Sequence, residues 1–506
     1  MTHLTHLTVQ IGLDYIQDGY EGETLIDHYE TTNHVAQVAW IVHLNPNLVQ
    51  VCIFGITTRD VDALYALAWS MSGLKKLEKL ILEFLGREEL WTMLSLSFWF
   101  ACPRSLKGLG LIFEHSNYDD DDDDDDDEDV LQEQDKATHT DLKKIASWGV
   151  QRRQGPLDNL GFMMVEHLAY LGTTQVCEFF QACPGLVHLT LPLLDPGVDA
   201  VQLGRTIART CTRLTELISK RHPDAQREVL VFEILENMAV VPALNKFVAI
   251  GLFPVSDRMM AAFRKHTATL TWVQFDYNGA MESRFIQLVL FECPALERFV
   301  LGGSEGWRIS VMPDLTVAQA VERKWASSRI KHLNLRISLG DLGVITDTAV
   351  PYYRRSAPII LTEQEQRQFA VLEKFYAQLG AQAEMETLEL WRIEPDLNAD
   401  NDNDDNDDFL RGPTFPGLLG LADPTTGRPG FLELLGGLKK LTSLRGSFSS
   451  YTDENKAIVG MNEVRWIAEA WPVLEEADFC LEPPYGGELS PCFEWLQQQR
   501  PELLLS

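Results

Sequence analysis

The chain has 506 residues and a formal net charge of -31, and 45% of its residues are hydrophobic. That hydrophobic content is normal for a folded soluble protein and excludes a wholly disordered chain. The negative charge repels phosphate backbones, which excludes general nucleic-acid binding and favours basic protein partners.

A phrase of the form L-x-x-L-x-L recurs along the chain, usually behind a proline and often behind Cys-Pro. Its first apolar positions are Leu4, Leu48, Leu77, Leu106, Leu186, Leu214, Leu244, Leu270, Leu296, Ile330, Met385, Leu441 and Leu474. Most neighbouring copies lie 26 to 34 residues apart, close to the roughly 20–29 residues of leucine-rich repeats. The phrase predicts an α/β leucine-rich-repeat solenoid, with a curved parallel sheet inside and helices outside.

Apolar residues at spacings of three and four predict helices between these strands. In chain order, the predicted helices cover residues 60–72, 199–212, 227–240, 256–266, 282–292, 315–325, 362–379 and 455–471. Four intervals between anchors are longer, at 44, 80, 55 and 56 residues. An insertion, or one missed degenerate repeat, explains each long interval.

Two acidic runs interrupt the repeats. Asp119 to Asp129 holds eleven acids, and Asp396 to Asp408 holds seven more. Such blocks do not build a packed core, and they serve either as solvated insertions or as a lure for a basic partner. The predicted organisation is N-terminal repeats over 1–115, an acidic, largely disordered insertion over 116–158, central repeats over 159–395, an acidic and Pro/Gly-containing disordered insertion over 396–430, and C-terminal repeats with a cap over 431–506.

Cysteine usage and the first residues bear on the compartment. Five of the eight cysteines lie inside or just ahead of the repeated phrase, where they serve as small buried hydrophobes: Cys52, Cys102, Cys183, Cys211 and Cys293. That use suits a reducing compartment. Residues 1–20 lack the features of a signal peptide, and no apolar stretch approaches the roughly 20 residues of a membrane span. We therefore expect a cytoplasmic or nuclear protein that does not bind membranes.

With the Cys-Pro anchors in view, the chain resembles fungal F-box/leucine-rich-repeat proteins. The matching segments are Asn45-Pro46-Asn47-Leu48, Gly73 to Leu77, Phe180 to Pro184 and Glu292 to Leu296. The resemblance covers the repeats alone. It implies that the repeats hold a protein substrate while an F-box docks a Skp-type adaptor of a cullin ubiquitin ligase.

The F-box itself is not found. No L-P-x-E/D motif followed by an F-box helix stands near the start, and Leu4 already opens a repeat. Terminal repeats normally need an atypical polar cap. We therefore expect either residues upstream of Met1 or a partner over that end, and a Skp-type adaptor is expected only if an F-box lies upstream.

Strand geometry selects the candidate binding residues. In L-x-x-L-x-L the fourth and sixth positions face the core, so the third and fifth face the concave side. The consecutive units at Leu244, Leu270, Leu296 and Ile330 give the richest set, because Trp and Arg are enriched at binding hot spots. The predicted partner-binding residues are Lys246, Trp272, Gln274, Arg298, His332 and Asn334.

Enzyme and metal motifs are missing. There is no G-x-x-x-x-G-K-[ST], G-x-S-x-G or H-E-x-x-H motif. Asp400, Asp402 and Asp404 mimic the first ligands of an EF-hand loop, but the required glycine and final glutamate are replaced by Asp405 and Arg411. No catalytic residue, metal or cofactor is therefore predicted.

The predicted function is protein binding on the concave face, in substrate recognition for a cullin-type ubiquitin ligase. The alternative is a free-standing acidic scaffold or inhibitor that binds a basic protein. In that version the aspartate runs assist by long-range attraction, which salt screens.

Overall fold

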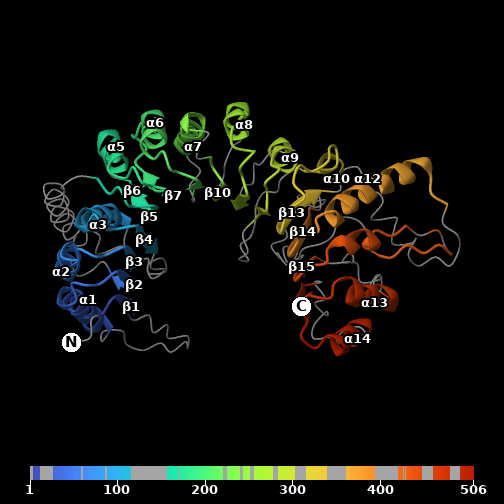
Figure 1. The fold of residues 1–506 in the computed structure, drawn as a ribbon, viewed down its shortest axis with the longest axis horizontal. Helices are drawn as coiled ribbons and strands as arrows, with labels where there is room; N and C mark the ends of the chain where they lie inside the picture. Colours follow the sequence, from blue (N-terminus) through green and yellow to red (C-terminus); the bar gives the residue numbers. More distant parts are fainter. Residues whose placement is uncertain are drawn as a thin grey trace, which may run out of the picture. The chain divides into compact units, whose positions relative to one another are not determined.

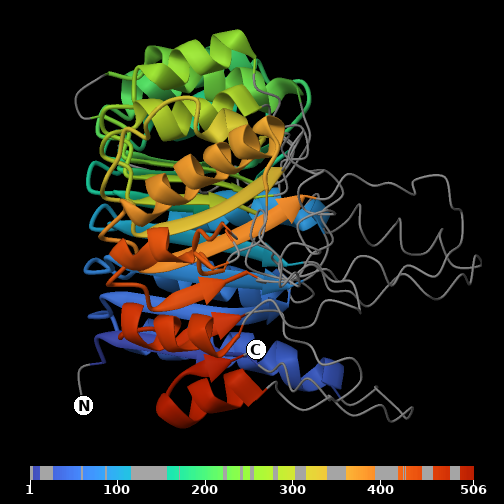
Figure 2. The ribbon, with the colours of Figure 1, turned by 90° about the vertical axis from the view of Figure 1, so that its right-hand side faces the viewer.

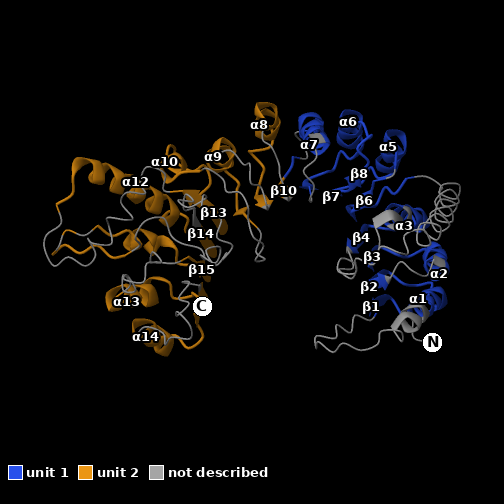
Figure 3. Cartoon of the chain, turned by 180° about the vertical axis from the view of Figure 1, so that it is seen from behind, with its two compact units in different colours: residues 1–244 blue, residues 245–506 orange. Residues whose placement is uncertain are grey.

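The structure is a computed structural model, and it describes residues 4–11, 27–57, 61–85, 88–114, 156–169, 171–219, 225–239, 243–250, 256–276, 283–302, 315–338, 360–393, 420–425, 427, 429–446, 460–478 and 491–505. The chain divides into two compact units, residues 1–244 and 245–506 (Figure 3). Within the described residues, seven neighbouring strands form the main sheet of the first unit and eight form that of the second.

In the first unit, strands and helices alternate along the chain. The strand order in the main sheet is β1-β2-β3-β4-β5-β7-β9, and a small separate sheet pairs β6 with β8. The elements are β1 (His6–Gln10), α1 (Asp27–Leu44), β2 (Gln50–Thr57), α2 (Val61–Ser72), β3 (Lys79–Leu85), α3 (Glu88–Ala101), β4 (Gly108–Glu114), β5 (Phe162–Val165), β6 (His167–Leu168), α5 (Thr173–Gln181), β7 (His188–Leu191), β8 (Leu193–Leu194), α6 (Ala200–Thr210), β9 (Glu216–Ser219) and α7 (Ala225–Asn237).

The second unit repeats the same alternation, with its strands in sequence order from β10 to β17. Its elements are β10 (Lys246–Ile250), α8 (Asp257–Arg264), β11 (Trp272–Asp276), α9 (Ser283–Glu292), β12 (Arg298–Leu301), α10 (Val317–Ala320), β13 (His332–Ser338), α12 (Glu363–Gly380), β14 (Thr387–Ile393), the 3-10 helix η3 (Leu432–Gly437), β15 (Ser443–Arg445), α13 (Met461–Ala470), β16 (Glu476–Asp478), α14 (Pro491–Gln499) and β17 (Leu504–Leu505).

Each unit has two layers. In both, the strands lie side by side as one layer, and the helices line one face of it (Figures 1 and 2). Neighbouring strands within each unit pair in parallel, as β2 with β3 and β12 with β13 do. A parallel connection needs a crossover that returns the chain to the same edge, and the intervening helices supply it. This α/β arrangement is compatible with the predicted solenoid.

A recurring backbone contact sets the register between neighbouring strands. The carbonyl of the residue just ahead of each strand accepts two N–H groups from the next strand's start. Asn245 O accepts from Thr271 N (2.8 Å) and Trp272 N (3.0 Å), and Thr271 O then accepts from Glu297 and Arg298. The same pattern runs through the first unit, from Thr5 to Val187. The side chains at equivalent positions are therefore stacked strand upon strand.

A tight turn precedes the strands and identifies repeats that the phrase alone missed. The N–H of the anchor residue donates to the carbonyl three residues earlier, as Leu48 does to Asn45 and Leu296 does to Cys293. Leu160 and Leu503 make the same bond, ahead of β5 and β17. The described part of the 80-residue interval therefore contains a repeat that the phrase missed, and its strand carries Met163 at the core position where most other copies carry leucine.

The core lies between the strands and their helices. Along β12, Phe299 and Leu301 are 0% and 3% exposed, whereas Arg298 and Val300, which alternate with them, are half-buried. Residues Phe247, Val273, Leu333 and Leu388 occupy the same core-facing row on neighbouring strands. Positions four and six of the phrase therefore face the core, as predicted from the period of two.

Helix positions largely match the predictions, with one correction. The predicted helix over 315–325 is wrong, because α10 covers only Val317–Ala320. Trp325 leaves the helix and is 4% exposed, and its Nε1–H donates to Ala320 O at 2.9 Å. The buried indole packs against Phe375 where the last two predicted helical turns would lie. Sequence periodicity had placed Trp325 on the helix face.

The predicted insertions fall mostly outside the described residues. Both acidic runs, Asp119 to Asp129 and Asp396 to Asp408, lie there entirely. At the edges of the predicted insertions, Leu157 is 0% exposed, and Leu432 N donates to Gly420 O at 3.0 Å. These two contacts belong to the packed parts that flank the predicted insertions.

The cysteines inside or just ahead of the repeated phrase pack as apolar side chains. Cys52, Cys102, Cys183, Cys211 and Cys293 are all buried. Burial, together with the neighbouring Cys183, raises the pKa of Cys211 to about 12, and burial with Glu292 does the same for Cys293. Thiols with such raised pKa values are inert, which agrees with a packing role.

Candidate functional site

The six predicted binding residues stand in two rows on four adjacent strands of the second unit. In the first row, Lys246 pairs in register with Trp272, Trp272 with Arg298, and Arg298 with His332. In the second row, Gln274 aligns with Val300 and Val300 with Asn334. We call these seven residues the Trp272 face.

This face lies on the side of the sheet away from the buried core residues. Lys246, Trp272, Gln274, Arg298 and His332 are all half-buried, and Asn334 is 8% exposed. The intervening residues of the same strands are packed against the helices. The face therefore offers side chains to a ligand without opening the core.

Trp272 is held by two cations and one amide. Lys246 Nζ lies 3.7 Å from the centroid of the indole ring, and Arg298 Cζ lies 4.3 Å from it. Each such contact stabilises by about 0.5–1 kcal/mol at an exposed site. Trp272 Nε1–H also donates to Gln274 Oε1 at 3.2 Å. The indole is thus fixed at the centre of the face.

Two buried polar atoms on this face have no hydrogen-bond partner. They are Nε of Arg298, a donor, and Oδ1 of Asn334, an acceptor. Leaving a buried donor or acceptor unpaired costs about 1–3 kcal/mol. Within the described part of the chain, the Arg298 guanidinium is held by its ring contact and not by a carboxylate.

His332 ends the first row in a mixed environment. Its Nδ1 lies 3.2 Å from Thr387 Oγ1, and its Nε2 lies 3.8 Å from a carboxylate oxygen of Glu386. Burial lowers the pKa of His332, and the Arg298 charge and Lys331 lower it further, while Glu386 opposes them. His332 is therefore neutral at pH 7 and does not add a third charge to Lys246 and Arg298.

Replacing Arg298 with glutamine is expected to raise the pKa of His332, because it removes a nearby positive charge. Because the pKa of His332 is lower in the folded chain, the unfolded chain protonates this imidazole first as the pH falls. The neutral His332 therefore contributes stability above its ordinary pKa of 6.5, and this contribution is lost as the pH falls through its pKa in the folded chain. An NMR titration of the His332 ring measures the shift. Lys374→Gln, on the exposed surface of α12, is the control and should leave it unchanged.

Sequence reasoning missed charged residues farther along the same face. Glu389 continues the second row beside Asn334, and Arg445 follows it. Arg445 Nη2 donates to Glu476 Oε1 at 3.0 Å, so this end of the face carries an ion pair. Arg336, 6% exposed, lies two residues beyond Asn334 on β13. The strand alternation could have found all of them, since each occupies an odd position of its copy.

The equivalent face of the first unit has a different chemistry. Its second row is largely apolar and aligns Cys52, Ile81, Gly110, Met164, Thr190 and Ile218. In its first row, the Phe162 and His188 rings stack at 4.5 Å, and His188 Nδ1 lies 2.9 Å from Glu216 Oε2. An aromatic ring flanked by two cations is therefore a property of the second unit's face.

Aromatic side chains also emerge on the helical side of the first unit. Trp40 of α1 is 63% exposed and Trp69 of α2 is 48% exposed. Together with Tyr65 and His43 they line a groove between these two helices. Trp40 stacks on His43 at 5.8 Å. These exposed tryptophans lie on helices and supply a matched control for Trp272.

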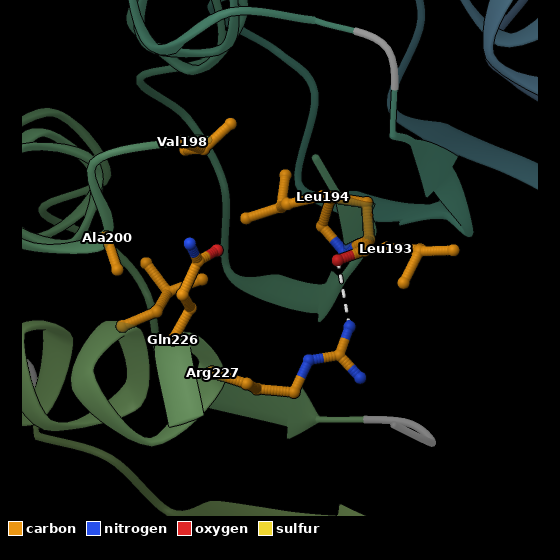
Figure 4. Close-up of a pocket in the computed structure, with 8 residues that line it drawn as sticks. Leu193, Leu194, Val198, Ala200, Gln226 and Arg227 are labelled. Carbon is orange, nitrogen blue, oxygen red and sulfur yellow. Dashed lines mark hydrogen bonds between the residues drawn. The ribbon is translucent and has the colours of Figure 1, made fainter. Parts of the chain in front are cut away.

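A small cavity in the first unit is too restricted for a ligand. It lies among β8, α6 and α7 and is lined by Pro192, Leu193, Leu194, Val198, Ala200, Gln226, Arg227 and Leu230 (Figure 4). Arg227 Nη2 donates to Pro192 O at 2.9 Å (Figure 4). Its free volume of about 20 Å³ accommodates about one water molecule. The charged group is thus already partnered, and the cavity is part of the packing.

Two further features bear on possible chemistry. In the described ranges, no group of three or more His, Cys, Asp or Glu side chains is arranged to hold a metal ion. None of the helices within those ranges combines the length and apolarity of a membrane span. Comparison with protein-family models and with the sequences of curated proteins gives no match. The Trp272 face is thus the best-developed candidate site, and its chemistry suits binding.

Proposed function

We propose that this protein is a leucine-rich-repeat solenoid that binds another protein through the Trp272 face. The observation that carries the proposal is the register of Lys246, Trp272, Arg298 and His332 on four adjacent strands. A tryptophan and an arginine at the centre of such a face are typical of binding hot spots. A face held by the sheet backbone is preorganised, which reduces the entropy lost on binding.

The resemblance to fungal F-box/leucine-rich-repeat proteins supplies the biological role in this proposal. The bound protein would be a substrate selected for ubiquitin ligation, with a Skp-type adaptor and a cullin in the same complex. This part depends on the repeated segments, such as Phe180 to Pro184 and Glu292 to Leu296.

Immunoprecipitation of the full-length protein, followed by quantitative mass spectrometry, tests both parts. Trp272→Ala should lose the partner, whereas Trp40→Ala, which removes a more exposed tryptophan on α1, should retain it. Equal recovery with both variants would contradict binding at the Trp272 face. Recovery of a partner without a Skp-type adaptor or cullin would remove the ligase role and leave the binding role intact.

The acidic scaffold remains as a second prediction with its own test. If the run from Asp119 to Asp129 attracts a basic partner, its deletion should weaken association and flatten the salt dependence, because exposed charges are screened beyond roughly 10 Å at 0.1 M salt. Replacing the run with a glycine–serine segment of equal length controls for the length of the insertion. Unchanged affinity and salt dependence would eliminate this version.

A further inference from the structure

We infer that the Trp272 face binds an acidic peptide segment of the partner protein, with a carboxylate at Arg298 and Lys246. This inference rests on the proposed function and names the chemistry of the partner. It departs from the expectation of a basic partner, which followed from the net charge of -31. The local charge of the face, rather than the total charge, decides what docks on it.

The first row is positively charged within an acidic chain. Lys246 and Arg298 both lie over the indole of Trp272, so two like charges are held around one ring. Among the neighbouring acids, Glu297 is engaged by Lys331 at 2.8 Å and by Arg329 at 3.0 Å. Two cationic side chains held against one ring attract an anion, and this gives the ligand a reason to be anionic.

Arg298 is the group best placed to receive that carboxylate. A guanidinium binds a carboxylate through two parallel N–H bonds, and such charge-assisted bonds are about twice as strong as neutral ones. The Arg298 side chain makes no hydrogen bond or ion pair with a described residue, and its Nε is an unpartnered donor. Stacking on Trp272 orders the side chain in advance, so less entropy is lost when the ligand arrives.

Asn334 indicates that the ligand is a peptide. Its Oδ1 is a buried acceptor without a partner, one row from Arg298 on the adjacent strand. A peptide offers both a carboxylate for Arg298 and a backbone N–H for this oxygen. A nucleic acid carries a phosphate at every nucleotide, and its chain would meet Glu389 and Glu476 farther along the same face. A peptide segment can instead place a single carboxylate at Arg298.

His332 should make the affinity for this peptide depend on pH. The groups that face it are Arg298 on β12, Lys331 beside it, and Glu386 and Thr387 at the start of β14. A carboxylate bound at Arg298 offsets the charge that opposes protonation. Binding should therefore be accompanied by a rise in the pKa of His332, and the affinity should increase as the pH falls below neutrality.

A fluorescein-labelled peptide of alternating glutamate and glycine is a suitable probe, and the glutamine–glycine peptide is its control. Fluorescence anisotropy with the full-length protein should show binding of the glutamate peptide alone, weakening as salt rises. Arg298→Glu should reduce the affinity by at least about tenfold, since it replaces an attraction with a like charge. Lys374→Glu makes the same change in net charge on the exposed surface of α12 and should have little effect.

Three results would overturn the inference. The first is equal binding of the glutamate and glutamine peptides, and the second is equal loss with Arg298→Glu and Lys374→Glu. The third is tighter binding of a labelled single-stranded oligonucleotide, lost in Arg298→Glu, which would assign the face to nucleic acid. The immunoprecipitation described above distinguishes failure of this inference from failure of the proposed function. A partner lost in Trp272→Ala but retained in Arg298→Glu leaves the binding face intact and removes only its acidic ligand.

Discussion

Replacing Phe299 with alanine is expected to lower the free energy of unfolding by about 3–5 kcal/mol, the usual cost of removing a buried phenylalanine ring. Phe299 is 0% exposed and lies in the core-facing row, between Val273 of β11 and Leu333 of β13. The truncation leaves a cavity in the middle of the sheet, which the backbone ladders on both sides prevent from closing. Denaturant unfolding followed by circular dichroism measures the loss.

The next residue along the strand provides the control. Val300 is half-buried and belongs to the Trp272 face, on the opposite side of the sheet. Val300→Ala should cost less than about 1 kcal/mol, because it removes little buried area and opens no enclosed cavity. If the two substitutions cost the same, the assignment of alternate residues to core and open face would be contradicted.

Gly380→Ala should destabilise the second unit by about 1–3 kcal/mol, the range expected when a packed site is overfilled. Gly380 ends α12, and a Cβ there would meet the carbonyl oxygen of Leu434 at 1.8 Å and its carbon at 2.8 Å. Both atoms belong to the backbone of η3, so neither can rotate away. Alanine gains at most about 1 kcal/mol of helix propensity over glycine, and the clash exceeds that gain.

Gly436→Ala is the matched comparison for this substitution. Gly436 lies within η3, and the nearest atom to an added Cβ is a ring carbon of Trp466 at 3.6 Å, an ordinary contact. Its thermal unfolding midpoint should therefore stay near that of the unsubstituted protein while that of Gly380→Ala falls by several degrees. A higher midpoint for Gly380→Ala would show that α12 and η3 are not packed backbone to backbone.

The positions of most strands could be predicted, because each anchor residue of the repeated phrase lies at a fixed spacing from the strand that follows it. Leu296 and Ile330 fix the positions of Phe299 and Leu333 in the core, and the residues between them then face outward. The repeat phrase also located β2, β3, β4 and β7. It failed at β5, where Met163 occupies the core position usually held by leucine, and a flexible methionine weakens the pattern without weakening the packing.

The helices were less predictable where apolar residues cover more than one face. Trp91, Leu94, Phe98 and Trp99 of α3 are all buried, and so are Thr92 and Ser95. A helix buried on most sides shows no clear stripe, so periodicity does not reveal it. In α10 the reverse happened, since Trp325 extended the apparent stripe while its indole was folded back to Ala320.

Some features of the candidate site could be predicted from the sequence, and others could not. Register on four strands could be predicted, because residues at equivalent positions of a parallel repeat align. The contacts that give the face its chemistry could not. Whether Lys246 and Arg298 lie over Trp272, and whether Asn334 finds a partner, depends on rotamers chosen by neighbouring side chains. The sequence also suggested a basic partner from total charge, whereas the local row is cationic.

Site-specific photocrosslinking is the most direct test of the claim that the Trp272 face is where the partner sits. A benzophenone amino acid at Val300, beside Arg298 on β12, is compared with the same group at Glu373, exposed on α12. Irradiation of the full-length protein in cell extract should join Val300 to a discrete partner, and Trp272→Ala should abolish that product. A partner joined at Glu373 and not at Val300 would contradict the account, because it would move binding to the helical side.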